Sequence, residues 1–379
     1  MIIWVIGRDY PTPSNRMCGS FELNQAKMLA ADNKVLYIGL TLSFFRHGDP
    51  RGYRTFSEDD ITILAYSHFY FPGQMGIYSE AFERRCWRNV LQQAEEITGK
   101  PDIIHIHYPT MIGDISSIEY YRKAGSRIFI TEHWSKVLIN KLTGHELKRL
   151  RYYADASECI ISVSRIVQEA IRNTVNVSVP MKVIPNAIAS VFFKKQKSNQ
   201  RQVFTFIAVG RMVAIKQFDK VIEEFRKVFA NTLNVRLRVI GSGPEMKKLM
   251  KIAGNDSRIE FLGSISIEKV AEEMAQANAL VSFSKYETFC VPVIEAWATG
   301  IPAIVSAQSG VAEYVNDDNG IVVSSDSSDL LGEAMMKIYK ENGRYNSKNI
   351  SCFAKQYFDK EIILSEIKNL YKMQRTCEN

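Results

Sequence analysis

The feature that most constrains the fold is an alternation of short β-branched runs with longer amphipathic stretches, which restarts after residue 200. Each short run suits a buried strand and each longer stretch suits a helix packed across it, so the pattern predicts βαβ units and parallel sheets. In the first half we expect strands at Ile2–Ile6, Val35–Gly39, Ile103–Ile106, Arg127–Ile130 and Cys159–Val163, and a helix at Phe21–Ala31. In the second half we expect strands at Phe204–Val209, Arg236–Ile240, Ile259–Leu262, Ala279–Ser284 and Ala303–Ser306, with helices at Phe218–Phe229 and Val291–Thr299.

The chain is long enough for two domains, because 379 residues exceed what one hydrophobic core usually organises. The Pro185-Asn186 turn and the polar run Lys194–Gln200 have no apolar face to bury and mark the boundary. We therefore predict a Rossmann-like domain over residues 1–188, a hinge linker over 189–200 and a second Rossmann-like domain over 201–355. The amphipathic stretch Tyr357–Met373 forms a C-terminal helix within 356–379, which either caps the second domain or crosses back to the first.

Composition excludes several classes of protein. The net charge of +7 is modest and is not concentrated in one segment, which argues against a nucleic-acid partner. The six cysteines are scattered singly, so neither a disulfide framework nor a zinc site is indicated. No apolar run approaches the length of a spanning helix, and Met1–Ile6 is too short for a signal peptide, so we expect a cytoplasmic protein.

Two cations follow the first strand of the second half. Arg211 comes directly after Phe204–Val209, and Lys216 precedes the helix that starts near Phe218. The carboxyl end of a parallel strand, with a helix N-terminus beside it, is where α/β sheets bind phosphate groups. The pair predicts a diphosphate site, and the alternative is two solvated loop cations.

Two carboxylates occupy the connection after Ala279–Ser284. Glu287 lies in the loop, and Glu295 lies one turn into a helix that Pro292 begins and Gly300 ends. Carboxylates in this position can accept hydrogen bonds from hydroxyl groups of a sugar and a ribose. The alternative is a loop acid and a residue that complements the helix dipole.

Glu287 and Glu295 resemble the E-x7-E motif of the retaining family 4 glycosyltransferases of GT-B fold, also called glycosyl transferases group 1. The resemblance extends over about residues 200–325, in the order and approximate spacing of that family. Its further motifs are Val209-Gly210-Arg211 with Lys216, Ile240–Pro244, Phe261–Gly263, Glu295–Pro302, and Ser309–Glu313 with Asn319-Gly320. It implies an α/β fold of two Rossmann-like domains whose parallel sheets face each other across a cleft.

The resemblance also implies roles for single residues. Arg211 and Lys216 would hold the diphosphate of a nucleotide-sugar donor, Glu287 would contact the transferred sugar, and Glu295 would contact the ribose. Backbone near Gly263 would meet the base, and Gly310 with Val311 would lie beside the sugar or its phosphates. Gln217 and Cys290 depart from the family, which often has glycine at both places, so the sequence does not identify the sugar.

The first half resembles the family more distantly. The loop Arg8–Gly19 is placed like the Gly-rich acceptor loop, but only Gly19 of the usual glycine pair is present, with Cys18 in the other place. Arg16, Gly19 and Asn24 are the acceptor-binding candidates, and ordinary loop and helix-surface residues are the alternative. His133 follows strand Arg127–Ile130 and resembles the histidine that faces the donor sugar; the alternative is a histidine packed beside Trp134.

His105 and His107 lie on one face of an expected strand, because strand side chains alternate. Without a clear third ligand we expect hydrogen-bonded histidines there in preference to a metal pair.

The resulting hypothesis is a retaining hexosyltransferase that needs no metal and no cofactor. It would move a sugar from a UDP- or GDP-linked donor to a saccharide or lipid-linked saccharide, in surface polysaccharide biosynthesis. Arg211, Lys216 and a helix N-terminus would stabilise the leaving diphosphate, and hinge closure would bring His133 to the donor. His133, Arg211, Lys216 and Glu287 are the catalytic candidates.

Alternatives from other classes remain. A nicotinamide-dependent enzyme would need a G-x-G-x-x-G turn after a strand, and neither half supplies one. A nucleotide-sugar epimerase of the same architecture, or a non-catalytic sugar-nucleotide-binding protein at the membrane surface, stays open. Phe82–Leu91 and the cations of Lys148–Arg151 predict a peripheral contact with the inner face of the cell membrane, with a solvated helix as the alternative.

Overall fold

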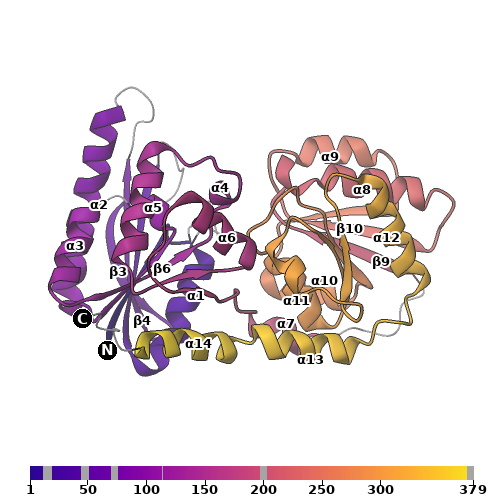
Figure 1. Cartoon of the computed structure of the whole chain (residues 1–379). Helices are drawn as coiled ribbons and strands as arrows, with labels where there is room; N and C mark the ends of the chain where they lie inside the picture. Colours follow the sequence, from indigo (N-terminus) through magenta and orange to yellow (C-terminus); the bar gives the residue numbers. More distant parts are fainter. Residues whose placement is uncertain (12–18, 44–50, 70–75, 113, 197–202, 374–379) are drawn as a thin grey trace. The chain divides into compact units, whose positions relative to one another are not determined.

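The computed structural model describes residues 1–11, 19–43, 51–69, 76–112, 114–196 and 203–373. The chain divides into two compact units: Met1–Ile184 together with Leu364–Asn379, and Pro185–Ile363. Each unit is a sheet covered by helices, which gives the α/β class expected from the alternating pattern (Figure 1).

The first unit is built on eight strands in the order β3-β4-β2-β1-β5-β6-β7-β8. All neighbours pair in parallel except β3, which runs antiparallel to β4. The elements are β1 (Ile2–Gly7), α1 (Ser20–Leu29), η1 (Ala30–Asp32), β2 (Lys34–Ser43), β3 (Gly52–Glu58), β4 (Ile61–Phe69), α2 (Gly76–Thr98), β5 (Ile103–His107), η2 (Pro109–Met111), α3 (Ile115–Lys123), β6 (Arg127–Glu132), α4 (Ser135–Leu138), α5 (Gly144–Ala156), β7 (Cys159–Ser162), α6 (Arg165–Thr174), β8 (Met181–Val183) and α14 (Lys360–Lys372). The strand order reverses between β1 and β5, and such a reversal is where α/β sheets bind ligands.

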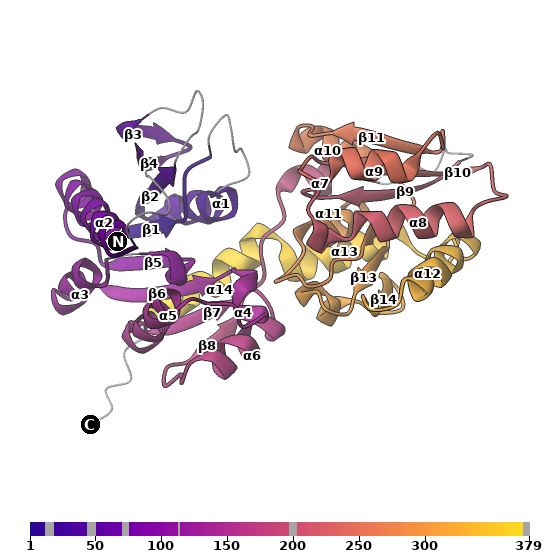
Figure 2. The same cartoon turned by 90° about the horizontal axis from the view of Figure 1, so that it is seen from above.

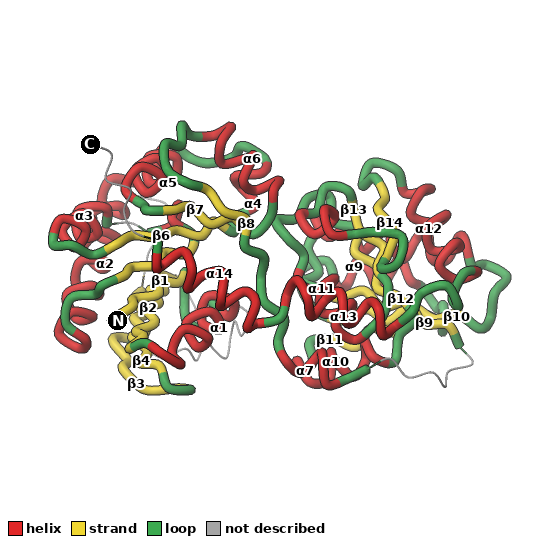
Figure 3. Tube along the Cα trace, turned by 60° about the horizontal axis from the view of Figure 1, so that its bottom comes forward, coloured by secondary structure: helices red, strands yellow, loops and turns green. Residues whose placement is uncertain are grey.

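The two faces of this sheet are covered by different helices. On one face the Trp4 indole donates to Thr98 of α2 and its ring meets Tyr121 of α3. On the other face His105 contacts Gln25 of α1 and Tyr371 of α14. Figure 3 shows α1 and α14 together on that side of the sheet. The C-terminal helix therefore completes the core of the first unit, although it follows the whole second unit in the chain.

The second unit has a six-stranded, fully parallel sheet in the order β11-β10-β9-β12-β13-β14 (Figure 2). The elements are α7 (Ser190–Lys194), β9 (Phe204–Val209), η3 (Ala214–Lys216), α8 (Phe218–Val228), β10 (Val235–Ile240), α9 (Met246–Ala253), β11 (Ile259–Gly263), α10 (Ile267–Ala275), β12 (Ala279–Ser282), α11 (Val291–Thr299), β13 (Ala303–Ser306), η4 (Gly310–Tyr314), β14 (Gly320–Val323), α12 (Ser328–Lys340) and α13 (Ser347–Phe358). In sequence order this is 3-2-1-4-5-6, the doubly wound arrangement of nucleotide-binding folds. Its reversal lies between β9 and β12, the strands that precede Arg211 and Glu287.

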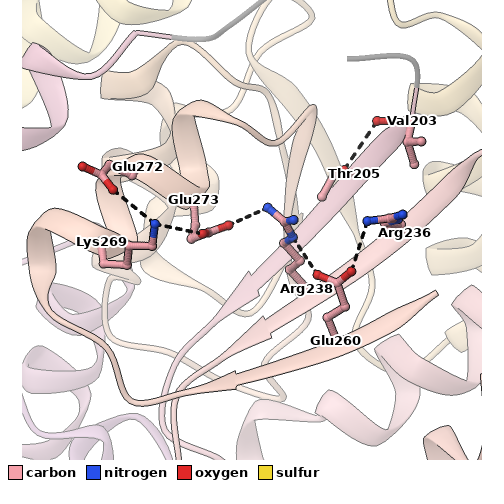
Figure 4. A network of polar contacts seen from close by, with 8 residues as sticks. All are labelled: Val203, Thr205, Arg236, Arg238, Glu260, Lys269, Glu272 and Glu273. Atoms are coloured by element: carbon pink, nitrogen blue, oxygen red, sulfur yellow. Dashed lines mark hydrogen bonds and ion pairs between the residues drawn. The ribbon is translucent and has the colours of Figure 1, made fainter. Parts of the chain in front are cut away.

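A charged network lies over the outer strands of the second sheet (Figure 4). Arg238 of β10 binds Glu260 of β11 at 3.0 Å and Glu273 of α10 at 2.5 Å. Arg236 pairs with Glu260 at 3.2 Å, and Lys269 reaches Glu273 at 3.6 Å. Strand alternation explains the pattern, because the neighbouring Leu237 is fully buried on the opposite face.

The segment expected as a hinge linker begins with α7, whose Phe192 is fully buried in the second unit. The amphipathic stretch that begins at Tyr357 starts in the last turn of α13, and α14 begins only at Lys360. Residues from Leu364 onward belong to the first unit. The sequence leaves two courses open for this segment, and in the structure the segment crosses to the first unit.

Candidate functional site

Three glycines align at the carboxyl ends of adjacent strands in the second unit. Gly210 donates its amide to Ile240, and Gly241 donates to the Gly263 carbonyl at 2.8 Å. A Cβ on Gly241 would lie 1.9 Å from the Gly210 oxygen, so only glycine allows this approach. A Cβ on Gly263 would meet nothing within 4 Å. The loops are thus packed tightly at Gly241 and have open space at Gly263.

Lys216 and Glu287 form an ion pair across the point where the strand order reverses. Lys216 ends η3 after β9, and Glu287 lies in the loop after β12; a backbone hydrogen bond from Lys285 to Ile215 also joins these two connections at 2.8 Å. Burial lowers the pKa of Lys216, but the Glu287 carboxylate outweighs burial, so the net pKa is raised and the amine stays charged. Both side chains keep about a fifth of their surface exposed, 20% and 21%, which leaves them accessible to a ligand.

Glu287 is held by its neighbours through its backbone. It forms a parallel bridge with Ser309, and its carbonyl accepts a hydrogen bond from Gly310 at 3.0 Å. Val311 is fully buried and donates its amide to Phe289. The sequence candidates Gly310 and Val311 therefore support the loop that carries Glu287.

Glu295 lies in the second turn of α11, the helix that follows this loop. Burial alone raises the pKa of its carboxyl group to about 8. Within the described ranges its carboxyl group makes no hydrogen bond or ion pair. A half-buried acid without a protein partner is ready to accept a hydrogen bond from a ligand hydroxyl.

Arg211 lies directly after Gly210 on the connection that follows β9, the same connection that carries Lys216. Its side chain is exposed, and none of the described acidic residues pairs with it. Arg211 and Lys216 therefore differ in state: the first is a solvated cation, and the second is held by a carboxylate.

Gln217 and Cys290, the two departures from the family's glycines, both have left-handed backbone. Gln217 has φ 48° at the start of α8, and Cys290 has φ 86° at the start of α11. This conformation costs a non-glycine residue roughly 1–2 kcal/mol. Both helix starts therefore have a backbone conformation that favours glycine but carry larger side chains, and the Gln217 Oε1 atom is buried and unpaired among the described atoms.

In the first unit, Gly19 brings α1 against the loop after β1. It has φ 75°, and a Cβ there would lie 2.1 Å from the Asp9 carbonyl oxygen. The Tyr37 hydroxyl donates to that same carbonyl and so fixes the loop. The candidate Arg16 lies outside the described residues. Asn24 is exposed, and it lies about 200° around α1 from the buried Glu22.

Three histidines form a stacked row at the carboxyl edge of the first sheet. The His105 and His107 rings stack with centroids 4.5 Å apart, and the His107 and His133 rings with centroids 5.2 Å apart. His105 bonds to Thr131 at 2.7 Å, and His107 Nδ1 lies 2.9 Å from His133 Nε2. Burial lowers the pKa of His133 to about 3, with the positive charge of Arg8 as a second cause, so the imidazole is neutral. The two strand histidines are hydrogen-bonded as expected.

The residues that sequence reasoning missed are buried polar groups around this row. Glu132 accepts the backbone amides of His133 and Trp134 at 2.8 and 2.7 Å, and burial raises its pKa to about 7. Glu22 is 1% exposed, and burial raises its pKa too. The sequence does show an acid directly before His133, at the end of a strand. The contact of Tyr371 with His105 spans 266 positions and leaves no signal in the sequence.

The described residues hold neither a metal cluster nor a membrane span. No group of three or more His, Cys, Asp or Glu side chains in the described part of the chain is arranged to hold a metal ion. Among the described helices, none combines the length and the hydropathy needed to cross a bilayer.

Solved structures share the fold over nearly the whole chain. Sucrose-phosphate synthase from Thermosynechococcus elongatus superposes with a TM-score of 0.76 at 18% identity, with 98% of each chain covered. Anabaena HepE in complex with UDP and glucose gives a TM-score of 0.70 at 16% identity, with 98% of this chain and 99% of the other covered. The fold therefore defines this chain as a GT-B protein of two Rossmann-like domains, with a charged strand edge in the second.

Sequence comparison gives the family. Residues 190–355 match the family Glycosyl transferases group 1, and residues 40–190 match Glycosyltransferase Family 4. This chain belongs to the glycosyltransferases of that group 1, family 4 type, as its motifs predicted.

Curated relatives agree with this assignment. One component of the phosphatidylinositol N-acetylglucosaminyltransferase of Arabidopsis thaliana is 24% identical over 77% of this chain, which spans 65% of that relative. N-acetyl-alpha-D-glucosaminyl L-malate synthase of Bacillus anthracis is 21% identical over 82% of each chain.

Proposed function

We propose that this protein is a retaining glycosyltransferase that moves a sugar from a nucleotide-linked donor to a hydroxyl group of a saccharide or lipid-linked saccharide. The observation that carries the proposal is the meeting of Lys216 and Glu287 at the reversal between β9 and β12. Arg211 and Glu295 lie on the same two connections, and neither has a side-chain partner in the described part of the chain. A cation pair for phosphate and two carboxyl groups for hydroxyl groups match the two ends of a nucleotide sugar.

The donor is proposed to carry UDP or GDP, and the comparisons favour UDP. Anabaena HepE was solved with UDP and glucose, and a trehalose-6-phosphate synthase with UDP-2-fluoro glucose. Two relatives are named for N-acetylglucosaminyl groups. A UDP-linked hexose or N-acetylhexosamine is therefore the first donor to test.

We assign the donor contacts to residues at the carboxyl ends of the strands of the second sheet. Arg211 and Lys216 bind the diphosphate, and Lys216 exchanges its Glu287 partner for a phosphate oxygen. The released Glu287 carboxylate accepts hydrogen bonds from the transferred sugar, and Glu295 accepts them from the ribose. The open backbone at Gly263 meets the base, and Gly310 with Val311 keeps Glu287 in place.

The reaction is a same-face displacement at the anomeric carbon. The bond to the diphosphate oxygen breaks, the bond to the acceptor oxygen forms, and the acceptor proton passes to the leaving diphosphate. Charge that develops on the diphosphate is stabilised by Arg211, Lys216 and the amides of a helix N-terminus, so no metal ion is required. Orienting the acceptor hydroxyl supplies the rest of the rate enhancement.

The first unit is proposed to bind the acceptor at its own strand reversal, between β1 and β5. Gly19 shapes this edge, Arg16 and Asn24 contact the acceptor, and His133 donates a hydrogen bond to a sugar. A role in surface polysaccharide biosynthesis fits a saccharide or lipid-linked saccharide acceptor.

Peripheral contact with the inner face of the cell membrane is part of this proposal. The exposed cations Arg84, Arg85 and Arg88 of α2 carry it, with Lys148 and Arg151 of α5. Trp87 does not contribute, because it is 2% exposed and packs into the core. Binding to anionic vesicles at low salt, lost in Arg84→Glu/Arg88→Glu, would support the contact; no binding by the wild type would remove it.

The test of the function is a transfer assay with UDP- and GDP-sugars, saccharide and lipid-linked saccharide acceptors, and EDTA throughout. We expect nucleotide release that depends on acceptor, with the anomeric configuration of the donor kept in the product by NMR. An inverted product would overturn retention, and a need for added metal would overturn metal independence. Conversion of the free nucleotide sugar without acceptor would identify an epimerase.

A further inference from the structure

His107 lies between two other histidines in the row at the carboxyl edge of the first sheet. Its ring stacks on His105 on one side and on His133 on the other, at interplanar angles of 17° and 19°. It is 1% exposed, and its Nδ1 atom is bonded to His133 Nε2 at 2.9 Å. Its own Nε2 atom is buried and has no hydrogen-bond partner among the described atoms.

All three imidazoles are neutral at physiological pH. Burial is the first cause that lowers each pKa: to about 3 for His105 and for His133, and well below the ordinary value for His107. Arg8 adds its positive charge beside His133, while the carboxyl group of the preceding residue, Glu132, accepts hydrogen bonds from the backbone amides of His133 and Trp134 and from the Thr110 hydroxyl. Each ring therefore carries one proton, and the tautomer decides which nitrogen donates.

The neighbours of His105 determine its own tautomer. Nδ1 of His105 receives the Tyr371 hydroxyl at 2.6 Å and the Gln25 amide at 3.3 Å. Burial raises the pKa of the Tyr371 phenol, so its O–H is present as a donor. Two donors at Nδ1 leave the His105 proton on Nε2, where it is donated to Thr131 at 2.7 Å.

His107 has the opposite arrangement. A proton on its Nε2 would be a buried N–H without an acceptor, which is rarer and costlier in proteins than an unused lone pair. The proton therefore belongs on Nδ1, where it is donated to His133 Nε2. His133, being neutral, then carries its own proton on Nδ1, which makes no hydrogen bond within the described residues.

We propose that His107 is a positioning residue that holds His133 in the Nδ1-protonated tautomer, so that His133 presents a hydrogen-bond donor to its ligand. His133 Nε2 is occupied by His107, so His133 acts on a sugar oxygen as a neutral donor and not as a base through Nε2. The identity of that ligand rests on the proposed function; the tautomer does not.

The direct test is the nitrogen chemical shifts of His133 in protein with ¹⁵N-labelled histidine, assigned with His133→Gln. In the wild type we expect a protonated shift at Nδ1 and an unprotonated shift at Nε2. His107→Leu should move the two toward an averaged pair, and His107→Asn, whose amide can replace the Nδ1–H, should retain the wild-type pattern. Tyr371→Phe is the matched control, because it removes a hydrogen bond of the row and leaves the His107–His133 contact.

An Nε2-protonated His133 in the wild type, or an unchanged pattern in His107→Leu, would overturn the proposal. Kinetics give a second readout: kcat of His107→Leu should fall roughly ten- to hundredfold with the donor KM little changed, and His107→Asn should recover most of it. If the shifts behave as expected and the wild type transfers no sugar, the tautomer assignment stands and the proposed function fails. Equal loss of kcat in Leu and Asn variants with normal shifts would show that the tautomer is not what His107 supplies.

Discussion

The two units use the same strand-reversal geometry but fill it with opposite chemistry. In the second unit the reversal holds the Lys216–Glu287 ion pair, the exposed Arg211 and Glu295, whose carboxyl group has no partner among the described residues. In the first unit the corresponding edge holds three neutral, stacked histidines, with the positive charge of Arg8 beside His133. The ion pair and Arg211 suit a diphosphate, and a row of neutral imidazoles suits hydroxyl groups that carry no charge.

The units also differ in how they tolerate side chains near helix starts. Gly19 of the first unit has a carbonyl where a Cβ would lie, whereas Gln217 and Cys290 of the second unit already carry side chains in left-handed backbone. The difference indicates that close packing determines the conformation of the loop at Gly19. In the second unit, Gln217 and Cys290 hold strained backbone beside the site.

The largest expected effect is a loss of stability when a substitution disrupts the close packing of Gly19 in the first unit. Gly19→Ala should lower the free energy of unfolding by roughly 3 kcal/mol, because a left-handed alanine and a collision with Asp9 add together. Gly99→Ala is the matched control: Gly99 has φ 81° and nothing within 4 Å of its Cβ position, so its cost should be about 1 kcal/mol. Urea unfolding measures both, and equal costs would refute the steric argument.

Removal of the Lys216 charge should have a nearly equal effect on the free energy of nucleotide binding. Lys216→Ala should weaken UDP binding about a hundredfold, roughly 3 kcal/mol, because it removes a phosphate partner and leaves Glu287 uncompensated beside it. Calorimetry with UDP, GDP and ADP in the presence of EDTA measures the change. Lys220→Ala is the control, because Lys220 lies on the adjacent helix and pairs only with Glu223 in the described structure. Equal effects of the two substitutions would contradict a specific site.

Glu295 should make the second unit sensitive to pH. Its folded pKa of about 8 exceeds the ordinary value of 4.5, so between these values the folded state holds a proton that the unfolded state has lost. Stability should therefore fall as pH rises through this window and level off above pH 8. Glu295→Gln should be more stable than the wild type above that pH by about 1–2 kcal/mol, after allowance for partial exposure, and should bind UDP less tightly.

Thermal unfolding from pH 4 to 9 measures this effect, with Glu333→Gln on the exposed side of α12 as the control. A pH profile that is the same in the wild type and Glu295→Gln would show that Glu295 is not the titrating group.

The smallest expected effect is a change in stability at Gln217, the left-handed residue at the start of α8. Gln217→Gly should raise stability by about 1 kcal/mol over Gln217→Ala, since both remove the side chain and only glycine relieves the left-handed backbone. Chemical unfolding of the two variants side by side isolates the backbone contribution. A glycine variant no more stable than the alanine variant would contradict the strain assigned to this position.

Much of the fold could be predicted from local pattern. The strands Phe204–Val209 and Ile103–Ile106, and the helix Val291–Thr299 between Pro292 and Gly300, were located from β-branched runs and helix signals. The antiparallel β3–β4 pair was missed, because it lies outside the βαβ alternation. The pairing of Lys216 with Glu287 could be anticipated only through the family motifs, since 71 positions separate them.

By itself, the sequence determined the α/β class, the family and the side chains that meet at the second unit's strand edge. These follow from periodicity and from motifs whose residues lie on the connections after two strands that are neighbours in the sheet, β9 and β12. Tertiary structure alone decided that α14 returns to the first unit, that Trp87 is buried, and that Tyr371, His105, His107 and His133 form one row. The partners of the ring nitrogens lie 26 to 266 positions away along the chain, and no local pattern encodes which of these segments pack together.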